Sequence, residues 1–551
     1  MYKSLKNLSL LCLILFAYCN QKKQTVQPED GLASFSADSL KQDIAILASD
    51  SFMGRKPFTA GETLTIDYLQ KQFASVGLEP GNGNSFLQAV PMVNILATAA
   101  PEMQVKSAKS NFTLKAYDDY IIWTDKTDPN ISLENTELVF AGYGVIAPEY
   151  NWNDYEGLDV KGKVVMVMVN DPGFWVGDTT LFKGKTMTYY GRWTYKFEEA
   201  ARQGAKGCLI VHNIKAASYP FSVQQKSFNT SRLQLDNRGK DIKNCEVIGW
   251  LTENTANKLL KAAGFDSSLL VKANQRGFKA VPLNLQLSTS IKVQATYDKS
   301  YNVIGKITGT KRPDEVIIYS AHWDHLGIGH PDVTGDSIYN GALDNATGTA
   351  GLLELARAFK SMKTKPERTI IILSVTAEEQ GLLGSKYYAE NPVYPVDKTV
   401  ANINMDGLNR YTKTKDIIVI GEGQSELEEY LKEEVEKTGD YISFDTHPEA
   451  GYYYRSDHFN FAKAGIPALY IKNGSDVIGK DKAYGQKLKD DYTNNNYHQP
   501  SDNFDAATWS MEGAVSDLKL LFLVGRRLAF EENWPQWKAT SEFKAIRDKK
   551  K

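Results

Sequence analysis

The sequence predicts an α/β protein with a mostly parallel central sheet flanked by helices, together with a smaller β-rich α+β unit. Two observations indicate this class. From residue 295 onward, short apolar strands alternate with helix-length amphipathic stretches, a pattern typical of a parallel sheet covered by helices. The chain has 551 residues, 42% of them hydrophobic, so it is long enough for two domains and apolar enough for large cores.

The elements of this alternating half follow from periodicity and from turn residues. Strands are expected at 316–320, 369–375, 400–404, 417–420 and 468–471, and helices at 347–359, 382–390, 426–436 and 459–463. The N-terminal part adds a helix at 36–48, a loop at 50–62 and a helix at 63–76 that ends before Gly77. In such sheets, sites form beyond the carboxyl ends of the strands, so functional residues are expected just after each strand.

Residues 130–290 have a different character. Strands are expected at 137–144, 162–168 and 207–211 and a helix at 196–203, with no cluster of His, Asp and Glu among them. The segment is therefore expected to form a self-contained unit. Its two cysteines, Cys208 and Cys245, are compatible with a disulfide in an oxidising compartment and equally with two buried thiols.

The N-terminal residues are typical of an export signal. Two lysines precede an apolar run at 8–18 that is too short to span a bilayer. Residues 15–19 (LFAYC) resemble a bacterial lipoprotein cleavage site with Cys19 as the lipidated residue, although Tyr18 is larger than the residue usual before that cysteine. We therefore expect export across the inner membrane to the periplasm, or anchoring in the outer membrane through Cys19, with plain secretion as the alternative.

Charge argues against one class of partner. The formal net charge is −2, which gives no electrostatic case for binding nucleic acid.

Acidic and imidazole side chains gather just after the expected strands of the second half. In chain order they are His322, Asp324, Asp344, Glu378, Glu379, Asp406 and His498. Each has an ordinary alternative, because a glutamate pair is often solvated surface, an aspartate before a helix is often an N-cap, and an aspartate before glycine is often a turn residue. Their joint occurrence at successive strand ends instead indicates a divalent-metal site, with zinc the leading candidate.

The sequence around these residues resembles peptidase family M28, the co-catalytic zinc aminopeptidases and related exopeptidases. The resemblance rests on five motifs in order, HWDHLG, GALDNATG, TAEEQGLLGS, NMDG and YHQPSD. It implies a zinc-exopeptidase (aminopeptidase-like) fold, and residues 130–290 resemble the protease-associated (PA) domain that many members carry as an insertion. The implied division is a signal peptide at 1–19, a flexible tether at 20–32, a peptidase domain at 33–129 and 291–537, the PA domain at 130–290 and a polar C-terminal tail at 538–551.

The resemblance implies two Zn²⁺ ions per subunit and a set of five ligands. His322 and Asp406 would bind one ion, Glu379 and His498 would bind the other, and Asp344 would bridge both. Two zinc ions held close together need such a shared carboxylate, and they can clamp both the attacking and the developing oxygen.

Further roles are implied for the neighbours of these ligands. Glu378 would be the general base that activates a metal-bridged water. Asp324 would accept a hydrogen bond from the non-ligating nitrogen of His322, and the peptide between Asp344 and Asn345 would be cis. The remaining histidines considered are assigned to structure or surface: His212, His325, His330 and His447.

The segment 450–467 resembles the family's substrate pocket. One of Tyr452, Tyr453 and Tyr454 would stabilise the tetrahedral oxyanion, and Arg455 would meet a substrate carboxylate. Ordinary aromatic packing explains the tyrosine run equally well.

The expected function is an extracytoplasmic dizinc exopeptidase, foremost an aminopeptidase, that acts on peptides or proteins. Three alternatives remain: a carboxypeptidase or dipeptidase of the same fold, for which Arg455 is the only hint; a glutaminyl cyclase with one zinc ion; and a peptide-binding homologue without catalysis. The intact Glu378–Glu379 pair and the complete ligand set favour hydrolysis over the last two.

Overall fold

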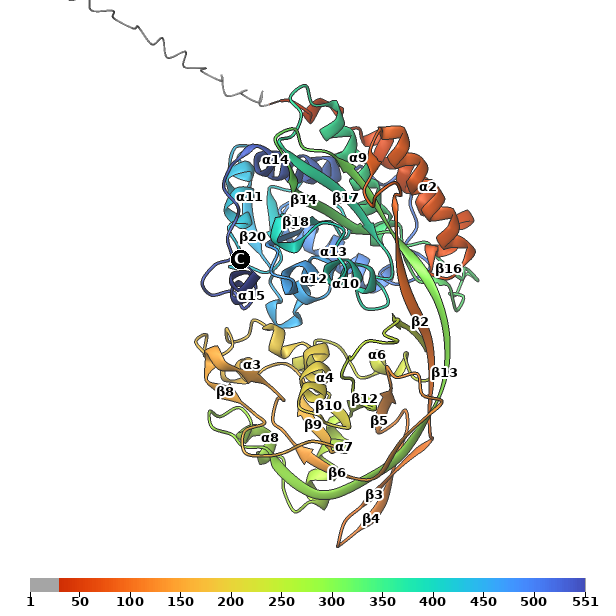
Figure 1. Cartoon of the computed structure of the whole chain (residues 1–551), viewed down its shortest axis with the longest axis vertical. Helices are drawn as coiled ribbons and strands as arrows, with labels where there is room; N and C mark the ends of the chain where they lie inside the picture. The colour runs from red at the N-terminus through yellow and green to blue at the C-terminus, as the bar shows by residue number, and fades with distance from the viewer. Residues whose placement is uncertain (1–28, 551) are drawn as a thin grey trace, which may run out of the picture.

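The computed structural model describes residues 29–550, so the predictions made for the signal peptide and for Cys19 lie outside the described residues. Two bodies are joined by a long two-stranded ribbon (Figure 1). The ribbon consists of β13 (Val281–Ile307) and β2 (Leu87–Ala99), which pair antiparallel along the whole of β2. A separate hydrophobic core fills each body. The core of the lower body in Figure 1 consists of residues between Val93 and Val293, and the core of the upper body consists of residues before and after that segment.

The central sheet of the upper body is mostly parallel, as predicted. Its four parallel strands lie in the order β17 (Arg368–Val375), β14 (Arg312–His322), β18 (Thr399–Asn404) and β21 (Ala468–Asn473). β13 pairs antiparallel with β17, and β19 (Asp416–Val419) and β20 (Tyr441–Phe444) extend the other edge. All of β17 is buried, because helices cover both faces of the sheet.

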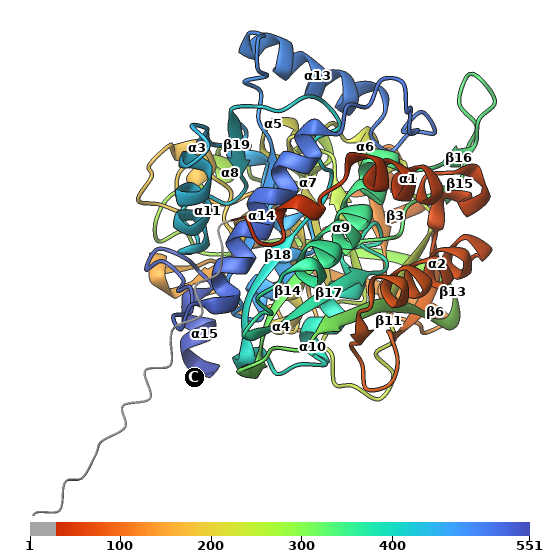
Figure 2. The same cartoon turned by 90° about the horizontal axis from the view of Figure 1, so that it is seen from above.

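Alternate residues of each central strand point to opposite helical layers. Ile317 and Tyr319 of β14 face the layer of α1 (Ala37–Leu47), α2 (Ala60–Val76), α9 (Thr347–Ser361) and α14 (Glu512–Phe530), onto which Figure 2 looks. Val316 and Ile318 face α10 (Leu383–Glu390) and α12 (His458–Lys463). α11 (Leu427–Glu436) packs against α14. This alternation is the two-residue period of a strand buried on both sides.

The lower body contains a second group of parallel strands, which the ribbon joins to the central sheet. These strands are β6 (Asn130–Phe140), β9 (Val164–Met168), β10 (Gly207–Val211) and β12 (Val247–Leu251), with β5 (Tyr120–Trp123) antiparallel at the edge. The hairpin of β3 (Glu102–Lys106) and β4 (Asn111–Lys115) joins β13, and β11 (Ser231–Leu235) pairs with β2. The two longest helices of this body are α4 (Trp193–Arg202) and α7 (Glu253–Ala262).

The described chain has further strands and α-helices. The strands are β1 (Glu79–Pro80), β7 (Ile146–Ala147), β8 (Trp152–Asn153), β15 (Gly327–Ile328) and β16 (Ile338–Tyr339). The helices are α3 (Gly173–Val176), α5 (Ile214–Ala217), α6 (Ser222–Gln225), α8 (Ser268–Lys272), α13 (Lys482–Asn495) and α15 (Lys544–Lys550). Among residues 29–550, none of the helices combines the length and apolarity needed to cross a lipid bilayer.

Three sequence expectations change in detail. Cys208 and Cys245 are free, buried thiols, so the disulfide alternative is not realised. The end of the expected tether is packed, because Asp30 accepts hydrogen bonds from the backbone N–H groups of Lys363 and Thr364. The expected polar tail is also packed, since Phe543 is buried in a cluster with Trp537. Packing of this C-terminal segment is difficult to predict from sequence, because Phe543 is surrounded by charged residues in the chain.

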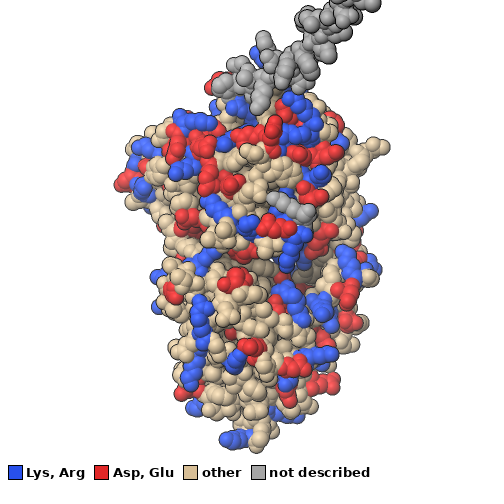
Figure 3. All heavy atoms as spheres, turned by 60° about the vertical axis from the view of Figure 1, so that its left-hand side comes forward, with Lys and Arg blue, Asp and Glu red and all other residues tan. Residues whose placement is uncertain are grey.

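Charge is mixed over the surface. Figure 3 shows acidic and basic side chains interspersed over the face turned towards the viewer.

Candidate metal centre

Three neighbouring parallel strands bring three of the predicted ligands together beyond the carboxyl ends of the sheet. His322 is the last residue of β14 and lies opposite Val375, the last residue of β17. Ser320 of β14 lies opposite Asn404, the last residue of β18. The segments that follow β17 and β18 therefore carry Glu379 and Asp406 to the same place as His322.

All five predicted ligands meet there, with Asp344 in the middle. Nε2 of His322 lies 3.3 Å from Oδ1 of Asp344 and 3.6 Å from Oδ1 of Asp406. Nε2 of His498 lies 3.3 Å from Oδ2 of Asp344 and 3.1 Å from Oε2 of Glu379. Each oxygen of Asp344 thus faces a different histidine, which is the arrangement of a carboxylate shared between two positions.

These residues fit zinc. The Nε2 atoms of His322 and His498 are buried and have no hydrogen-bond partner. Ligand atoms about 2.0–2.1 Å from a tetrahedral zinc ion lie about 3.3 Å from each other, close to the separations measured here. Two imidazoles with three carboxylates are also the donor set that a borderline divalent metal prefers.

The loop at Asp344 is held from two sides. The peptide between Asp344 and Asn345 is cis, as the family resemblance implies. The Asn345 side chain donates to the carbonyl of Met405 at 3.0 Å and accepts from the N–H of Gly407 at 3.1 Å, which ties this loop to that of Asp406. The carboxylate of Asp502 accepts from the N–H of Asp344 at 3.1 Å, so Asp502 organises this loop.

The two glutamates are aimed by a strained turn and by Asp324. Ala377, just after β17, has a φ of 52°, a left-handed conformation that is uncommon for alanine. The Asp324 carboxylate then accepts hydrogen bonds from the N–H groups of Glu378 at 3.0 Å and Glu379 at 3.4 Å. The turn at Ala377 and the Asp324 carboxylate together fix the backbone positions of Glu378 and Glu379.

The predicted hydrogen bond between His322 and the Asp324 carboxylate is wrong in its acceptor. Nδ1 of His322 lies 3.1 Å from the backbone carbonyl oxygen of Asp324 and 3.9 Å from its Oδ1, which is too far for a hydrogen bond. The Asp324 carboxylate instead accepts hydrogen bonds from the backbone N–H groups of Glu378 and Glu379, just beyond β17. The consequence for His322 is unchanged, because a carbonyl acceptor at Nδ1 also leaves Nε2 free for a metal.

The adjacent glutamates experience opposite electrostatic environments. Burial raises the pKa of Glu378 well above its usual value; the charge of His322 acts against this rise, and the negative charges of Glu379 and Asp406 add to it. Burial also acts to raise the pKa of Glu379, but His498 and His325 outweigh it and lower that pKa to about 2. Glu379 is therefore suited to remain an anionic ligand, and Glu378 is suited to hold and release a proton.

His325 is a member of this cluster that the sequence assigned to structure or surface. It is fully buried, and its Nδ1 lies 2.7 Å from Oε1 of Glu379, the oxygen that does not face His498. This separation is shorter than the edge of about 3.3 Å expected between two ligands of one tetrahedral ion. Neither atom has a hydrogen-bond partner, and His325, Asp344 and Glu379 have ligand atoms close enough together to hold a metal ion, so His325 is either a support for Glu379 or an alternative ligand beside it.

A second residue missed from the sequence is Tyr497. Its ring stacks on His498 with a centroid separation of 3.9 Å, and 46% of the residue is exposed. Its position immediately before His498 in NYHQPSD is the only sequence signal for it.

The predicted pocket residues separate into different environments. Tyr453 and Tyr454 are buried in an aromatic cluster, and the hydroxyl of Tyr454 donates to Glu542 at 2.8 Å. Tyr452 is 42% exposed, and the Arg455 guanidinium lies 5.2 Å from the centre of its ring. Of the three tyrosines, Tyr452 is the one left open to a substrate.

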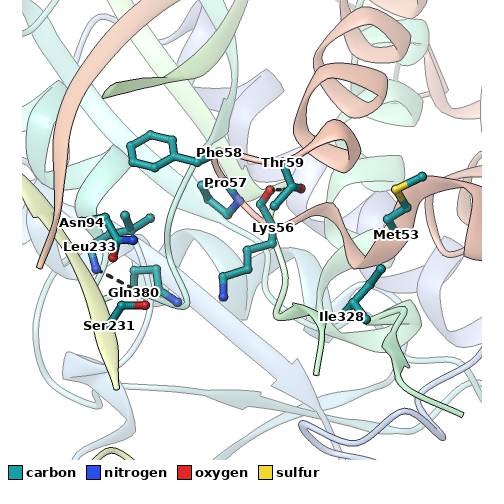
Figure 4. Close-up of a pocket in the computed structure, with 10 residues that line it drawn as sticks. All are labelled: Met53, Lys56, Pro57, Phe58, Thr59, Asn94, Ser231, Leu233, Ile328 and Gln380. Atoms are coloured by element: carbon teal, nitrogen blue, oxygen red, sulfur yellow. Dashed lines mark hydrogen bonds between the residues drawn. The ribbon is translucent and has the colours of Figure 1, made fainter. Parts of the chain in front are cut away.

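A cavity of about 320 Å³ opens next to the glutamate turn. Gln380, which follows Glu379, lines one side, and Ser231 and Leu233 of β11 come from the lower body (Figure 4). Lys56 extends into the same space from the 50–62 loop (Figure 4). Segments from both bodies therefore border the neighbourhood of the metal centre.

Comparison with known proteins agrees with this geometry. Residues 302–523 match the model of peptidase family M28, a segment that contains all five predicted ligands and Glu378. This segment of the chain is therefore similar to peptidase family M28.

Individual relatives are similar over shorter stretches. The chain is 35% identical to Aminopeptidase NAALADL1 of Mus musculus over 130 residues, 23% of this chain and 16% of that protein. It is 27% identical to Carboxypeptidase Q of Xenopus laevis over 250 residues, 45% of this chain and 42% of that protein. The matches thus span less than half the length of these curated relatives.

A solved structure is similar over nearly the whole chain. The aminopeptidase from Aneurinibacillus sp. strain AM-1 is 17% identical and gives a TM-score of 0.49, with 91% of this chain and 96% of that chain covered.

Proposed function

We propose that the protein is a zinc metallo-exopeptidase that holds two zinc ions. The observation that carries this proposal is Asp344, whose two carboxylate oxygens face two different histidines at 3.3 Å each. His322 and Asp406 would hold one ion, Glu379 and His498 would hold the other, and Asp344 would serve both. When bound, zinc polarises the scissile carbonyl and acidifies water.

The chain's own residues would move the proton. Glu378 is a partly buried carboxylate of the cluster that is not needed as a ligand, and burial raises its pKa, which suits a group that takes up and releases a proton. It would take a proton from the attacking water at its carboxylate and deliver it to the leaving amine. Asp324 holds the backbone N–H of Glu378 and so fixes where this transfer occurs.

An aminopeptidase is the leading form of this proposal. It is supported by the family and by the names of relatives, which include an aminopeptidase and also a carboxypeptidase. The test compares peptides with free and with acetylated N-termini, using zinc-loaded protein. An aminopeptidase cleaves only the free form, whereas equal cleavage of both would contradict this form of the proposal and point to the carboxypeptidase.

Metal content tests the number of ions separately. Two zinc ions per chain are expected after dialysis, and Asp344→Asn should lose most of both, because it removes the shared ligand. His330→Gln is the matched control, since His330 is exposed and lies outside the cluster. One zinc ion per chain in the unaltered protein would contradict the dizinc proposal.

The lower body and the N-terminus complete the proposal. We infer that residues 130–290 form a PA domain, and that the chain is exported and anchored through a lipid on Cys19. A separate hydrophobic core supports the first inference, and LFAYC at 15–19 supports the second. Cys19→Ala should release the protein from the membrane fraction; membrane association that survives this change would contradict the anchor.

A further inference from the structure

Arg55 is a buried arginine that binds four backbone carbonyls. Only 1% of the residue is exposed. Its guanidinium donates hydrogen bonds at 2.6 to 2.9 Å to the carbonyl oxygens of Leu47, Trp323, Asn340 and Gly341. A planar guanidinium has donors that point in several directions, so it can hold several chain segments at once. Arg55 therefore ties together points that are far apart in the sequence.

Three of these carbonyls belong to segments that carry predicted zinc ligands. Trp323 directly follows His322, which ends β14. Asn340 and Gly341 precede Asp344 in the loop before α9. One guanidinium thus joins the backbone beside His322 to the backbone that leads to Asp344, and the facing ligand atoms of these two residues lie 3.3 Å apart.

The backbone of Gly341 is in close contact with two members of the cluster. A Cβ atom at this position would lie 2.2 Å from the carbonyl oxygen of Asp344 and 2.4 Å from Cγ of His325. No space is therefore left between Gly341 and the ring of His325, whose Nδ1 lies 2.7 Å from Oε1 of Glu379. A shift of Gly341 would change the positions of both Asp344 and His325.

The side chain of Asn340 extends the network to the loop of His498. Its Nδ2 donates to Oδ1 of Asp50 at 2.7 Å and to Oδ1 of Asn503 at 2.8 Å. Asp50 lies in the same turn as Arg55, and Asn503 lies in the loop that follows His498. Arg55 and Asn340 together therefore connect three loops that carry predicted ligands.

The turn that carries Arg55 has an unusual backbone. Met53, Gly54 and Arg55 have φ values of 51°, 64° and 50°, all in the left-handed region. A Cβ atom on Gly54 would lie 2.5 Å from the carbonyl oxygen of Tyr339, so this position requires glycine. Left-handed residues with a side chain persist only where the surrounding contacts require them. The four hydrogen bonds of the Arg55 side chain are such contacts.

The charge of Arg55 does not by itself explain its place. Burial lowers its pKa to about 10, and the negative charges of Asp324, Asp502 and Asp344 act against this fall, so the group is a cation at neutral pH. A fixed cation disfavours the binding of Zn²⁺ nearby. The benefit of Arg55 to a metal centre must therefore come from its hydrogen bonds.

We propose that Arg55, together with Asn340, is a positioning residue of the metal centre. Its guanidinium holds the loops of His322 and Asp344 at a fixed separation, and the Asn340 side chain holds the loop of His498 to them. The inference rests on the proposed zinc site and deepens it, because it names groups outside the ligand set that keep the ligands at metal-binding distance.

The test measures zinc affinity and the visible spectrum of the cobalt-substituted protein. Arg55→Lys keeps the positive charge but offers one compact ammonium, which cannot span four carbonyls as the guanidinium does. Zinc affinity, measured by competition with a chromophoric chelator, should fall by roughly 10–100-fold, the effect usual for residues that orient ligands. The cobalt spectrum should also change in shape, because it depends on ligand geometry.

Arg368→Lys is the matched control. Arg368 is also completely buried, and its guanidinium also donates to backbone carbonyls, among them those of Leu528 and Glu532. It is the first residue of β17, at the end of the strand away from Glu378. Arg368→Lys should lower Tm, as the loss of buried contacts does, but leave the cobalt spectrum unchanged and zinc affinity within about threefold of the original.

A second variant covers the case in which Arg55→Lys does not fold. Asn340→Ala leaves the carbonyl that binds Arg55 and removes only the side-chain hydrogen bonds to Asp50 and Asn503. Zinc affinity should then fall by roughly tenfold.

The outcomes separate this inference from the proposed function. Unchanged zinc affinity and cobalt spectrum in the folded variants would overturn the inference alone, and so would an equal fall in Arg368→Lys. An unaltered protein that binds no zinc would refute the proposed metal centre and the inference with it. Neither measurement uses a peptide, so failure to cleave peptides leaves this test intact.

Discussion

Glu378 and Glu379 are adjacent in the chain and yet are predicted to fail in different ways. Glu378→Gln removes the proton-transfer group but no ligand, so the variant should hold both zinc ions and show kcat lowered by roughly 10²–10⁴-fold. Glu379→Gln removes an anionic ligand that faces His498, so it should lose one zinc ion. Metal analysis and steady-state kinetics on the same preparations check both statements. Full turnover by Glu378→Gln, or two zinc ions in Glu379→Gln, would refute the corresponding role.

His325 is predicted to matter through Glu379. His325→Ala removes the group that lies 2.7 Å from Oε1 of Glu379, so this carboxylate should turn more freely. We expect zinc affinity at the position of Glu379 and His498 to fall by roughly 10–100-fold, the effect usual for residues that orient ligands. Competition with a chromophoric chelator measures this, with His330→Gln as the control. An unchanged affinity would show that the contact is only packing.

Single residues also show what a sequence can predict. The ligands at the strand ends were predictable, because parallel strands in register bring their carboxyl ends to one edge and zinc limits the residue types. The contact of His325 with Glu379 was not predictable, because it depends on side-chain direction. Burial at the start of α12 is another such case, because Asp457 and His458 are polar in the sequence and yet completely buried in the fold.

At the scale of whole elements, the strong alternation of strands and helices predicted most of the sheet. α1, α9, β17, β18 and α11 begin and end within a few residues of the expected positions. The expected elements did not include α13 or α14, nor the length of β13, which runs through both bodies for 27 residues. Alternating burial along β13 is typical of several short strands, and only its pairing with β2 reveals one continuous strand.

α14 carries a buried acid that should make stability depend on pH. Asp517 lies on its buried face, and burial raises its pKa from 3.8 to about 8, opposed by Lys413. A carboxyl with a raised pKa favours the folded state below the unfolded pKa, and this contribution is lost as pH rises from about 4 to 8. Asp517→Asn should therefore raise the free energy of unfolding by on the order of 2–4 kcal/mol at pH 8 and by almost nothing at pH 4.

Urea unfolding at the two pH values checks this expectation. Glu512→Gln makes the same chemical change at an exposed position of α14 and should show no such gain. A gain for Asp517→Asn that is equal at both pH values would mean that the effect does not come from ionisation.

At the scale of the whole molecule, the metal centre belongs entirely to the body that contains the central sheet. Its clustered carboxylates Asp344, Glu378, Glu379 and Asp406 repel one another, and two zinc ions would neutralise them. A ligand that binds only the folded state stabilises it by about 4 kcal/mol at a thousandfold excess over Kd. Removal of zinc should therefore lower Tm by at least about 5 °C, because 1 kcal/mol corresponds to roughly 2–4 °C in a domain of some 150–250 residues.

Because the two bodies have separate cores, removal of zinc should destabilise the upper body and not the lower body. The lower body contains none of the predicted ligands, so calorimetry of the chelated protein should show the loss in the transition of the upper body, while any separate transition of the lower body stays in place. Zinc should restore the original Tm, and Asp344→Asn should respond to neither chelator nor zinc because its shared ligand is gone. An equal fall in both transitions would mean that the β2–β13 ribbon couples the two bodies into one unit, and an unchanged Tm would contradict a zinc site in the folded state.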